Sequence, residues 1–454
     1  MSAPSIVWLR RDLRFADQAA LVAAAWEGPV VPVYILDDET PKHRAMGAAS
    51  RWWLHRSLAA FGKEVEAKGS RLILRRGRSD QVLADLAKEI GATRIHALHH
   101  YEPWWRNAER AVAERLDLVL HDGNYLTPPG SITTGAGQSY KIFTPFWRAL
   151  RERLPPPDPL TAPDRLDAPA HRPESDRIED WQLLPTEPDW ATGFGEEWTP
   201  GETGARDRLD DFATISDRYG SQRNLPSIEG SSRLSPHLHF GEISPATVWH
   251  WIAGRGGSVD TFLGELGWRD YAQNVIRQLP DYGRANGRPQ LDTLRWRDAP
   301  DDLAAWQKGL TGYPIVDAGM RQLWVSGWMQ NRVRMIVASF LVKHLLIDWR
   351  FGEQWFWDCL VDADYGSNTT NWQWVAGSGI DANMFVRIMA PLVQSEKFDA
   401  ADYIRRWVPE LAQFADASIH DPPDDKRGAY PRKIIGHREA RERALAALAL
   451  TKRG

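Results

Sequence analysis

Cysteine is almost absent from this chain, whose 454 residues include only Cys359. One thiol cannot form an internal disulfide, and it cannot supply the several thiolates of an iron–sulfur cluster or a cysteine-rich zinc site. The histidine pairs His99-His100 and His237/His239 have no metal-ligand spacing with nearby acids. We therefore expect no metal site and a protein of the reducing cytoplasm.

Long apolar runs are also missing. No uninterrupted stretch is long enough to cross a bilayer, and three arginines stand near the N-terminus where a signal peptide would carry its apolar segment. The formal net charge of −4 argues against wholesale coating of nucleic acid but allows a local basic face. We expect a cytoplasmic monomer without a membrane partner.

The common nucleotide and nucleophile signatures are absent as well. No G-x-G-x-x-G follows the first expected strand, and the chain contains neither G-x-x-x-x-G-K nor G-x-S-x-G. The G-A-G at 135–137 falls in an expected loop, without the strand and helix that a phosphate site needs. These motifs therefore give no evidence for a dinucleotide enzyme, an NTPase or a serine hydrolase.

The first part of the chain alternates between short apolar runs and segments with helical spacing. The apolar runs are typical of mostly buried strands and cover residues 5–10, 30–36, 71–76, 94–100 and 116–122. The segments with helical spacing cover residues 16–27, 50–68, 79–91 and 104–116. Ser79 is positioned to cap the third helix. This alternation predicts a doubly wound, Rossmann-like parallel sheet with helices on both faces.

A change of composition near residue 150 ends this pattern. Residues 154–176 are rich in proline and aspartate and lack periodicity, which predicts an extended connection. The chain then becomes helical to near its end. We predict an α/β domain at 1–130, an interdomain linker at 131–205 and an all-α domain at 206–454.

Tryptophan is unusually abundant, with 23 in the chain. Because the indole N–H needs a partner, tryptophan is a poor choice for filling a core in bulk. The excess indicates stacking or electron transfer, although core packing is the ordinary role of any single indole. Residues 362–387 combine acids, an amide, an arginine, Trp372 and Trp374, a set that suits a heterocycle stacked on its face and hydrogen-bonded at its edge.

Several long motifs, in a fixed order, resemble one family. They are IVWLRRDLR near the N-terminus, YKIFTPFWRAL at 140–150, RLSPHLHFGEIS at 233–244, the run 311–350 and NTTNWQWVAGSGID at 368–381. Together they resemble the photolyase/cryptochrome family over nearly the whole chain. The resemblance implies an N-terminal α/β domain and a helical C-terminal domain that holds FAD.

The resemblance also implies which residues line the FAD. By matching position they are Tyr219, Ser231, Ser232, Arg233, Leu234, Ser235, Glu265, Arg269, Trp328, Asn331, Arg334, Asp362, Asp364 and Asn368. Ser232, Ser235 and Arg269 suit the diphosphate, whose oxygens accept from hydroxyls and guanidinium groups. Arg334 and Asp362 are expected to form a buried ion pair beside the flavin ring, since either charge alone would be costly.

The resemblance assigns catalytic roles to Asn368, Glu265 and three tryptophans. Asn368 takes the place that photolyases of the family give to an asparagine next to the flavin N5. An amide accepts from N5–H without titrating, whereas plant cryptochromes carry an acid there, so Asn368 favours repair over signalling. Trp372, Trp349 and Trp296 fall at the spacings of the family's electron-transfer chain, with Trp372 nearest the flavin and Trp296 nearest solvent.

The substrate positions are similar to those of photolyases that reverse cyclobutane pyrimidine dimers. Glu265 is expected to hydrogen-bond the pyrimidine edge, and Trp268 and Trp374 to flank the flipped dimer. Contacts with the lesion or nearby phosphates are assigned to Arg223, Asn331, Arg332, Met335 and Arg387.

One departure from the family pattern concerns the substrate. Gln330 stands where bacterial repair enzymes of the family commonly carry a histidine, and family members that act on (6-4) photoproducts need a histidine there and another at Met335. Both are absent, which argues against that substrate.

A second departure concerns a light-harvesting pigment. Folate-binding members place Asn-Glu after a Tyr-Glu-x, but Tyr101-Glu102-Pro103 is followed here by Trp104-Trp105. With Trp52 and Trp53, these indoles either stack on another pigment or close the pocket. A second chromophore therefore stays open: methenyltetrahydrofolate, a deazaflavin or flavin, or none.

We therefore expect an enzyme, a deoxyribodipyrimidine photo-lyase, that uses FAD and light to repair cyclobutane dimers in UV-damaged DNA. The alternative is a blue-light receptor of the cryptochrome type without repair activity. Asn368, the intact substrate positions and the lack of a C-terminal extension favour the enzyme. A third possibility is a member restricted to single-stranded lesions.

Overall fold

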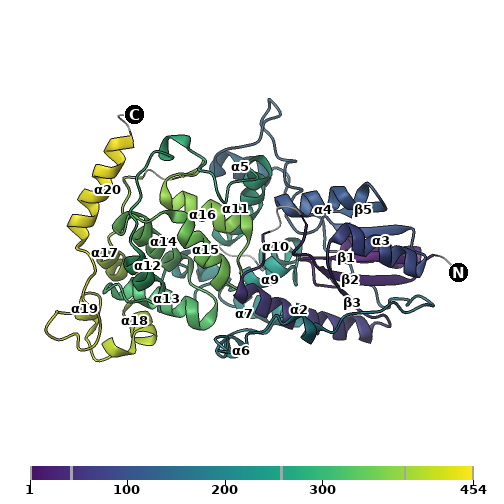
Figure 1. Ribbon diagram of the computed structural model, residues 1–454, viewed down its shortest axis with the longest axis horizontal. Coiled ribbons are helices and arrows are strands. Elements are labelled where there is room, and N and C mark those ends of the chain that lie inside the picture. The colour runs from purple at the N-terminus through teal and green to yellow at the C-terminus, as the bar shows by residue number, and fades with distance from the viewer. Residues whose placement is uncertain (1–2, 41–43, 256–258, 383–384, 452–454) are drawn as a thin grey trace. The chain divides into compact units, whose positions relative to one another are not determined.

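The computed structural model describes residues 3–40, 44–255, 259–382 and 385–451. The chain divides into two compact units, both drawn in Figure 1. The sheet unit comprises Met1–Asp189, Trp198–Ser216 and Ser232–Pro280, and the helical unit comprises Trp190–Glu197, Asp217–Ser231 and Asp281–Gly454. The segment 232–280 thus packs with the sheet although it belongs to the helical part of the sequence.

The sheet unit is built on five parallel strands in the order β3-β2-β1-β4-β5. The strands are β1 Ser5–Leu9, β2 Val30–Leu36, β3 Ile73–Arg76, β4 Arg94–Leu98 and β5 Asp117–His121. Every residue of β1 and β2 is buried, which explains why these segments are nearly continuous apolar runs instead of alternating ones. The predicted parallel sheet is confirmed.

Helices cover both faces of the sheet. Those of this unit are α1 Ala19–Glu27, α2 Ala48–Ala67, α3 Ser79–Ile90, α4 Pro103–Ala113, α5 Phe143–Arg151, α7 Glu202–Ala213, α9 Ser235–Phe240, α10 Pro245–Ala253 and α11 Asp260–Gln278. The chain adds β2 and β3 on one side of β1, then β4 and β5 on the other, so right-handed crossovers place α1 and α2 on one face and α3 and α4 on the opposite face. Figure 1 shows α2 below β1 and β2 and α4 above them.

The start of α3 corrects one prediction from the sequence. Ser79 is not the cap: Arg78 occupies the cap position, and its side chain makes no cap hydrogen bond. Asp37, directly after β2, accepts from the backbone N–H of Ser79 at 3.0 Å and from its hydroxyl at 2.6 Å. The prediction is wrong because the capping carboxylate comes from another loop, which a local pattern cannot reveal.

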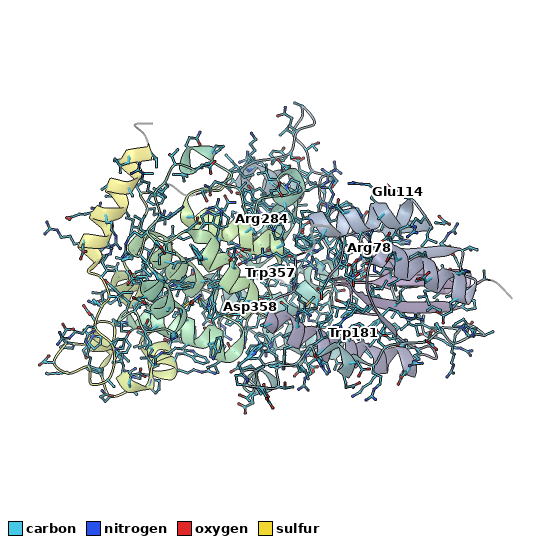
Figure 2. The ribbon with its side chains drawn as sticks, viewed as in Figure 1. Arg78, Glu114, Trp181, Arg284, Trp357 and Asp358 are labelled. Atoms are coloured by element: carbon cyan, nitrogen blue, oxygen red, sulfur yellow. The ribbon has the colours of Figure 1, made fainter. Side chains whose placement is uncertain are left out.

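The predicted linker is attached to the sheet unit. The backbone N–H of Asp176 donates to the carbonyl of Leu74 on β3 at 2.8 Å. The ring of Trp181, labelled in Figure 2, lies 6.1 Å from that of Tyr34 on β2, and its indole N–H donates to Asp176 at 3.0 Å. The composition predicted an extended segment but not this anchoring. The domain boundaries at 130 and 205 stay a prediction.

The helical unit consists of short and medium helices. They are α6 Phe194–Glu197, α8 Tyr219–Gln222, α12 Pro300–Gln307, α13 Pro314–Ser326, α14 Asn331–Ser339, α15 Trp349–Cys359, α16 Tyr365–Ala376, α17 Pro391–Lys397, α18 Ala401–Trp407, α19 Asp416–Ile419 and α20 His437–Thr451, with a π-helical turn at Phe340–His344. The predicted combination of an α/β domain and a helical C-terminal domain is confirmed.

The core of the helical unit brings α15 and α16 close together. Trp349 on α15 and Trp372 on α16 are 0% and 2% exposed. A Cβ atom at Gly352 would lie 2.1 Å from Cη2 of Trp372, so only glycine permits this approach. The contact fixes α16, the helix that carries Asn368. In the part of the chain that the structure describes, none of the helices is long and apolar enough to span a bilayer.

Candidate functional site

The residues assigned to flavin and DNA divide between the two units. The sheet unit holds Ser232, Arg233, Leu234, Ser235, Glu265, Trp268 and Arg269. The helical unit holds Tyr219, Arg223, Ser231, Trp296, Trp328, Asn331, Arg332, Arg334, Met335, Trp349, Asp362, Asp364, Asn368, Trp372, Trp374 and Arg387.

In the sheet unit, Arg269 on α11 is held by uncharged partners. One terminal nitrogen donates to the carbonyl of Asn124, and the other donates to the carbonyl of Leu238 at 3.1 Å. The guanidinium also lies 4.5 Å from the ring centroid of Tyr125. Because these partners carry no net charge, the side chain is fixed while its positive charge stays available to an anion such as a diphosphate.

The carboxylate beside Arg269 is fully buried. Asp270 accepts from the backbone N–H groups of Leu126 at 3.3 Å and Thr127 at 3.1 Å. Burial raises the pKa of Asp270 to about 7, against the lowering influence of Arg269 and these two hydrogen bonds. Asp270 thereby ties α11 to the loop that supplies the Asn124 carbonyl.

The hydroxyl-rich turn before α9 carries the other candidates of this unit. Ser232 Oγ accepts from the backbone N–H of Leu234 at 3.3 Å, and Leu234 itself is buried. Arg233 has a φ of 52°, and its guanidinium lies 4.4 Å from the ring centroid of Trp198. Ser235 is exposed at the start of α9. The turn is tight and carries a cation, and its contact with a diphosphate stays a prediction.

Glu265 and Trp268 lie three residues apart on α11, a spacing that puts them on one helix face. Both are half-buried. The indole of Trp268 stacks on the ring of Phe143 from α5, with centroids 3.6 Å apart and planes 10° apart. The motif around Phe143 is visible in the sequence, but its contact with Trp268 is not.

In the helical unit, Arg334 and Asp362 form the ion pair that the sequence predicts. Two parallel hydrogen bonds join the guanidinium to the carboxylate, at 3.1 and 2.9 Å. The side chains are 24% and 4% exposed, so the pair is largely removed from water. Arg334 Nε also donates to the carbonyl of Met329 at 2.6 Å. The result is a rigid and nearly neutral polar group.

Asn368 is oriented by a residue that the sequence reasoning missed. Its amide nitrogen donates to the backbone carbonyl of Glu353 at 3.0 Å and to the Glu353 carboxylate at 2.9 Å. An amide nitrogen has two hydrogens, and both are engaged here. Asn368 therefore keeps its oxygen as the atom that can accept from a ligand. No spacing rule links positions 353 and 368, so only the packing of α15 on α16 shows this.

The remaining flavin candidates of the helical unit differ in burial. Tyr219 and Trp328 are buried, and the guanidinium of Arg334 lies 5.9 Å from the ring centroid of Trp328. Asp364 caps α16 by accepting a first-turn backbone N–H at 2.7 Å. Asn331, at the start of α14, is exposed, and Ser231 is half-buried.

The three candidate tryptophans of the electron-transfer chain belong to one core. Trp349 and Trp372 are buried in it, while Trp296 is half-buried and packs against it. The indole N–H of Trp349 donates to Asn286 at 2.9 Å. Trp372 meets Trp306 edge-on, with centroids 6.3 Å apart. The greater exposure of Trp296 is in keeping with a position near solvent.

Several arginines gather around the start of α14. Arg332 donates to the side chain of Asn224 at 3.0 Å and lies 4.6 Å from the ring centroid of Phe398. Burial, together with the charges of Arg223 and Arg387, lowers the pKa of Arg332. Burial is the larger cause, and the charges of Arg223 and Arg387 add to it by repelling that of Arg332; an anion such as a DNA phosphate would relieve this repulsion.

The two positions that depart from the family pattern have structural contacts of their own. Gln330 caps α14 by accepting from Val333 N–H at 3.2 Å, and its amide nitrogen donates to the carbonyl of Arg223. Met335 lies beside Arg332, with N···S at 3.7 Å. Neither side chain is an acid. Trp374, two residues beyond Trp372 on α16, is half-buried.

Comparison with known proteins identifies the family of this chain. Residues 5–164 match DNA photolyase, and residues 262–450 match the FAD binding domain of DNA photolyase. A deoxyribodipyrimidine photo-lyase of Agrobacterium fabrum is 46% identical over 100% of this chain and 99% of its own length. The chain belongs to the photolyase/cryptochrome family.

Two further relatives show the range of this family. The crystal structure of a bacterial class III photolyase from Agrobacterium tumefaciens superposes with a TM-score of 0.96 at 46% identity, covering 100% of this chain and 98% of that one. Cryptochrome-1 of Arabidopsis thaliana is 34% identical over 98% of this chain and 70% of its own length. The predicted FAD-binding domain and the predicted class of enzyme, a photo-lyase, are confirmed.

The site residues fit FAD on their own chemistry. Arg269 offers a fixed positive charge, Arg334 with Asp362 offers donors and acceptors in a rigid pair, and Asn368 offers an oriented acceptor. These groups match a diphosphate and the edge of a flavin ring.

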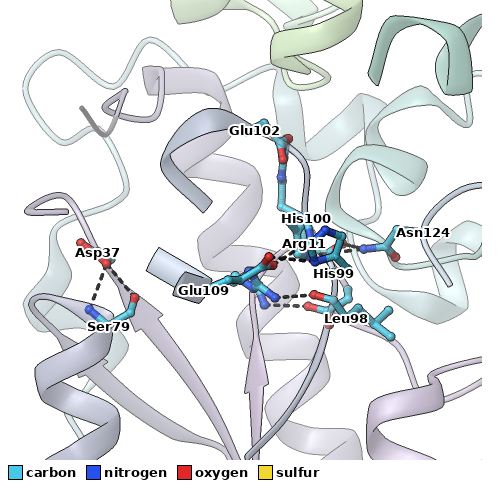
Figure 3. A network of polar contacts seen from close by, with 11 residues as sticks. Arg11, Asp37, Ser79, Leu98, His99, His100, Glu102, Glu109 and Asn124 are labelled. Carbon is cyan, nitrogen blue, oxygen red and sulfur yellow. Dashed lines mark hydrogen bonds and ion pairs between the residues drawn. The ribbon is translucent and has the colours of Figure 1, made fainter. Parts of the chain in front are cut away.

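An ionic network that includes Glu102 lies near the segment 101–105, for which the sequence leaves a second pigment open (Figure 3). Arg10 donates to Glu109 at 2.6 Å, His99 pairs with the same carboxylate at 2.8 Å, and Arg11 pairs with Glu102. The four tryptophans of this region, Trp52, Trp53, Trp104 and Trp105, are all buried. Their burial favours the reading in which they close the pocket, and the presence of a second chromophore stays an open prediction.

Proposed function

We propose that this protein repairs cyclobutane pyrimidine dimers in DNA by light-driven electron transfer. When bound and reduced, FAD would supply on illumination the electron that opens the cyclobutane ring, and the electron would return to the flavin once the ring has split. The coarser conclusion, a photolyase that acts in DNA repair, rests on the full-length similarity to photo-lyases.

The observation that carries the proposal is the locked amide of Asn368. Glu353 engages both amide hydrogens, so the side-chain oxygen is the acceptor available to a flavin N–H. An acid at this position could exchange a proton there, whereas an amide cannot. The amide supports repair over signalling as the task of this family member.

The tryptophans and the ion pair have supporting roles in this proposal. Trp372, Trp349 and Trp296 would pass electrons from an external reductant to FAD that has become oxidised, since they share one core and the last is half-exposed. Arg334 with Asp362 holds the ring side of the cofactor without adding net charge.

The lesion is bound by the residues that the sequence assigns to it. Trp268 and Trp374 stack on the flipped bases, each worth about 1–3 kcal/mol. Glu265 hydrogen-bonds the pyrimidine edge, and Asn331 and Met335 are assigned to the same lesion. Arg223, Arg332 and Arg387 neutralise phosphates, which would relieve the repulsion that Arg332 meets from the other two.

The same pocket does not suit (6-4) photoproducts. Reversing that lesion requires a proton for the oxygen that migrates, and an imidazole is the usual donor. Gln330 is already used as a helix cap, and Met335 has no acidic proton. We expect no activity on (6-4) thymines.

The test compares lesions of known chemistry on one oligothymidine. FAD-loaded, chemically reduced protein is illuminated with the cyclobutane dimer, the (6-4) photoproduct or undamaged DNA, and products are separated by chromatography. Restoration of thymines from the cyclobutane dimer alone supports the proposal. Restoration from the (6-4) photoproduct would contradict the assigned specificity, and no restoration from either would favour the receptor alternative. The same assay on single- and double-stranded forms of the oligonucleotide tests the third possibility, a protein restricted to single-stranded lesions.

A further inference from the structure

Trp268 on α11 is held by one aromatic side chain from another helix and by one from its own helix. Phe143, the first residue of α5, covers one face of its indole at 3.6 Å between centroids. Tyr271 meets the indole edge-on at 5.6 Å. A stack this close leaves the indole plane little freedom, because any tilt would overlap the phenyl ring.

A second contact of α5 strengthens this clamp. Trp147, one turn after Phe143, lies parallel to it, with planes 9° apart. A Cβ atom at Gly267 would lie 2.4 Å from Cε3 of Trp147, so glycine directly before Trp268 lets the two helices approach. Phe143 thus packs on the ring of Trp268, and Trp147 packs against the backbone of Gly267, the residue before it on α11.

The start of α5 is itself anchored to α11. The hydroxyl of Tyr271 donates to the carbonyl of Lys141 at 2.7 Å, and Tyr271 is fully buried. This bond holds the backbone two residues before Phe143. Phe143 is therefore placed from both sides, by its own helix and by Tyr271.

We infer that Phe143 is a positioning residue for lesion recognition, which presets the plane of Trp268 so that the opposite face receives a base of the flipped dimer. This inference rests on the proposed function. Ordering a side chain before binding removes an entropy cost from the binding step. Phe143 thus acts on the affinity for the lesion, through Trp268, and far less on the repair of a dimer already bound.

The test uses Phe143→Leu, which keeps an apolar side chain but loses the flat ring, and Phe143→Tyr, which keeps the ring. Dissociation constants in the dark are measured for dimer-containing and undamaged DNA, together with the light-driven repair rate at saturating substrate. Phe143→Leu should weaken dimer binding about tenfold, an estimate from the ordering cost of one side chain, with undamaged DNA unaffected. Phe143→Tyr should restore the wild-type affinity.

A matched control and a double variant make the outcome specific. Phe146 lies on the same helix, is fully buried and contacts Tyr271 at 5.5 Å, so Phe146→Leu should lower the melting temperature without changing lesion selectivity. In a Trp268→Ala background, Phe143→Leu should have no further effect on dimer affinity.

An effect of Phe143→Leu that adds fully to that of Trp268→Ala would overturn the inference. Equal weakening for damaged and undamaged DNA, unchanged dimer affinity, or a Phe143→Leu protein that does not fold would do so too, because each assigns Phe143 another role. A wild-type protein without preference for dimer-containing DNA would instead contradict the proposed function, and with it the basis of this inference.

Discussion

Arg269 in the sheet unit and Arg334 in the helical unit are both assigned to FAD, yet they are held in different ways. Arg269 donates to backbone carbonyls, while Arg334 forms two hydrogen bonds with the carboxylate of Asp362. The first arrangement fixes a full positive charge, and the second fixes a nearly neutral pair. A diphosphate needs the former, and the edge of a flavin ring accepts the latter.

The difference shows how each unit orients the residues that are assigned to FAD. In the sheet unit, the backbone carbonyls of Asn124 and Leu238 hold Arg269 without neutralising its charge. In the helical unit, long-range side-chain pairs such as Arg334 with Asp362 and Asn368 with Glu353 set orientation. Substitutions at Asp362 and at Arg269 should therefore differ in their effects on stability and on FAD binding.

The largest effect should come from removing the carboxylate of the helical unit's pair. Asp362→Asn leaves the guanidinium of Arg334 largely buried without a counter-charge, and we expect the free energy of unfolding to fall by about 3–5 kcal/mol, with loss of FAD. Chemical denaturation followed by flavin fluorescence measures both. As a control, Glu442→Gln breaks the exposed pair with Arg438 and should change little. A stable, FAD-loaded Asp362→Asn protein would show that neutralisation is not what Asp362 supplies.

The sequence predicted the architecture and one of these two side-chain pairs, Arg334 with Asp362, because local patterns and motifs carry that information. Continuous apolar runs identified the strands, and long motifs identified the family, whose pattern placed Arg334 and Asp362. The contacts it missed join distant segments: Asp37 with Ser79, Glu353 with Asn368, Phe143 with Trp268. Periodicity within one element carries no information on such partners, so they emerge only when the elements pack.

Each unit has one buried group that should make stability depend on pH. The two dependences should have opposite signs. Asp270 has a pKa raised to about 7, so its contribution is full below about pH 4 and falls as the pH rises through about 7. His344 has a pKa lowered to about 3 by burial, so its contribution is full above about pH 6.5 and falls as the pH drops toward 3. Each change is worth about 1.4 kcal/mol per pKa unit.

Unfolding curves measured from pH 4 to 8 check both signs. Asp270→Asn should remove the loss of stability between pH 4 and 7 and leave the acid side unchanged. His344→Phe should reduce the loss below pH 6.5 and leave the neutral side unchanged. Parallel pH profiles for wild type and either variant would contradict the assigned burial effect.

A smaller effect is expected from Arg269→Gln, which removes the fixed charge of the sheet unit. A charge-assisted hydrogen bond contributes about 1.5–3 kcal/mol, so FAD should bind roughly 10- to 100-fold more weakly to the apoprotein. Riboflavin, which lacks the diphosphate, serves as the comparison ligand in the same fluorescence titration. Equal weakening for FAD and riboflavin would mean that Arg269 does not act on the diphosphate.

The smallest effects should come from the two tryptophans assigned to the lesion, one in each unit. Trp268→Ala and Trp374→Ala should each weaken binding of dimer-containing DNA by about 1–3 kcal/mol, the value of one base stack. Trp26→Ala changes an indole that is 87% exposed on α1 and should have no effect. Filter binding in the dark measures all three. If dimer selectivity survives both Trp268→Ala and Trp374→Ala, the lesion lies elsewhere.

Light-dependent repair is the measurement that tests the account most directly. The purified, FAD-loaded and reduced protein is mixed with oligothymidine that contains one cyclobutane dimer, and the recovery of thymine absorbance is followed in blue light and in darkness. The account predicts multiple-turnover recovery in light and none in darkness. Dimers that remain intact under light, with FAD bound and reduced, would contradict it.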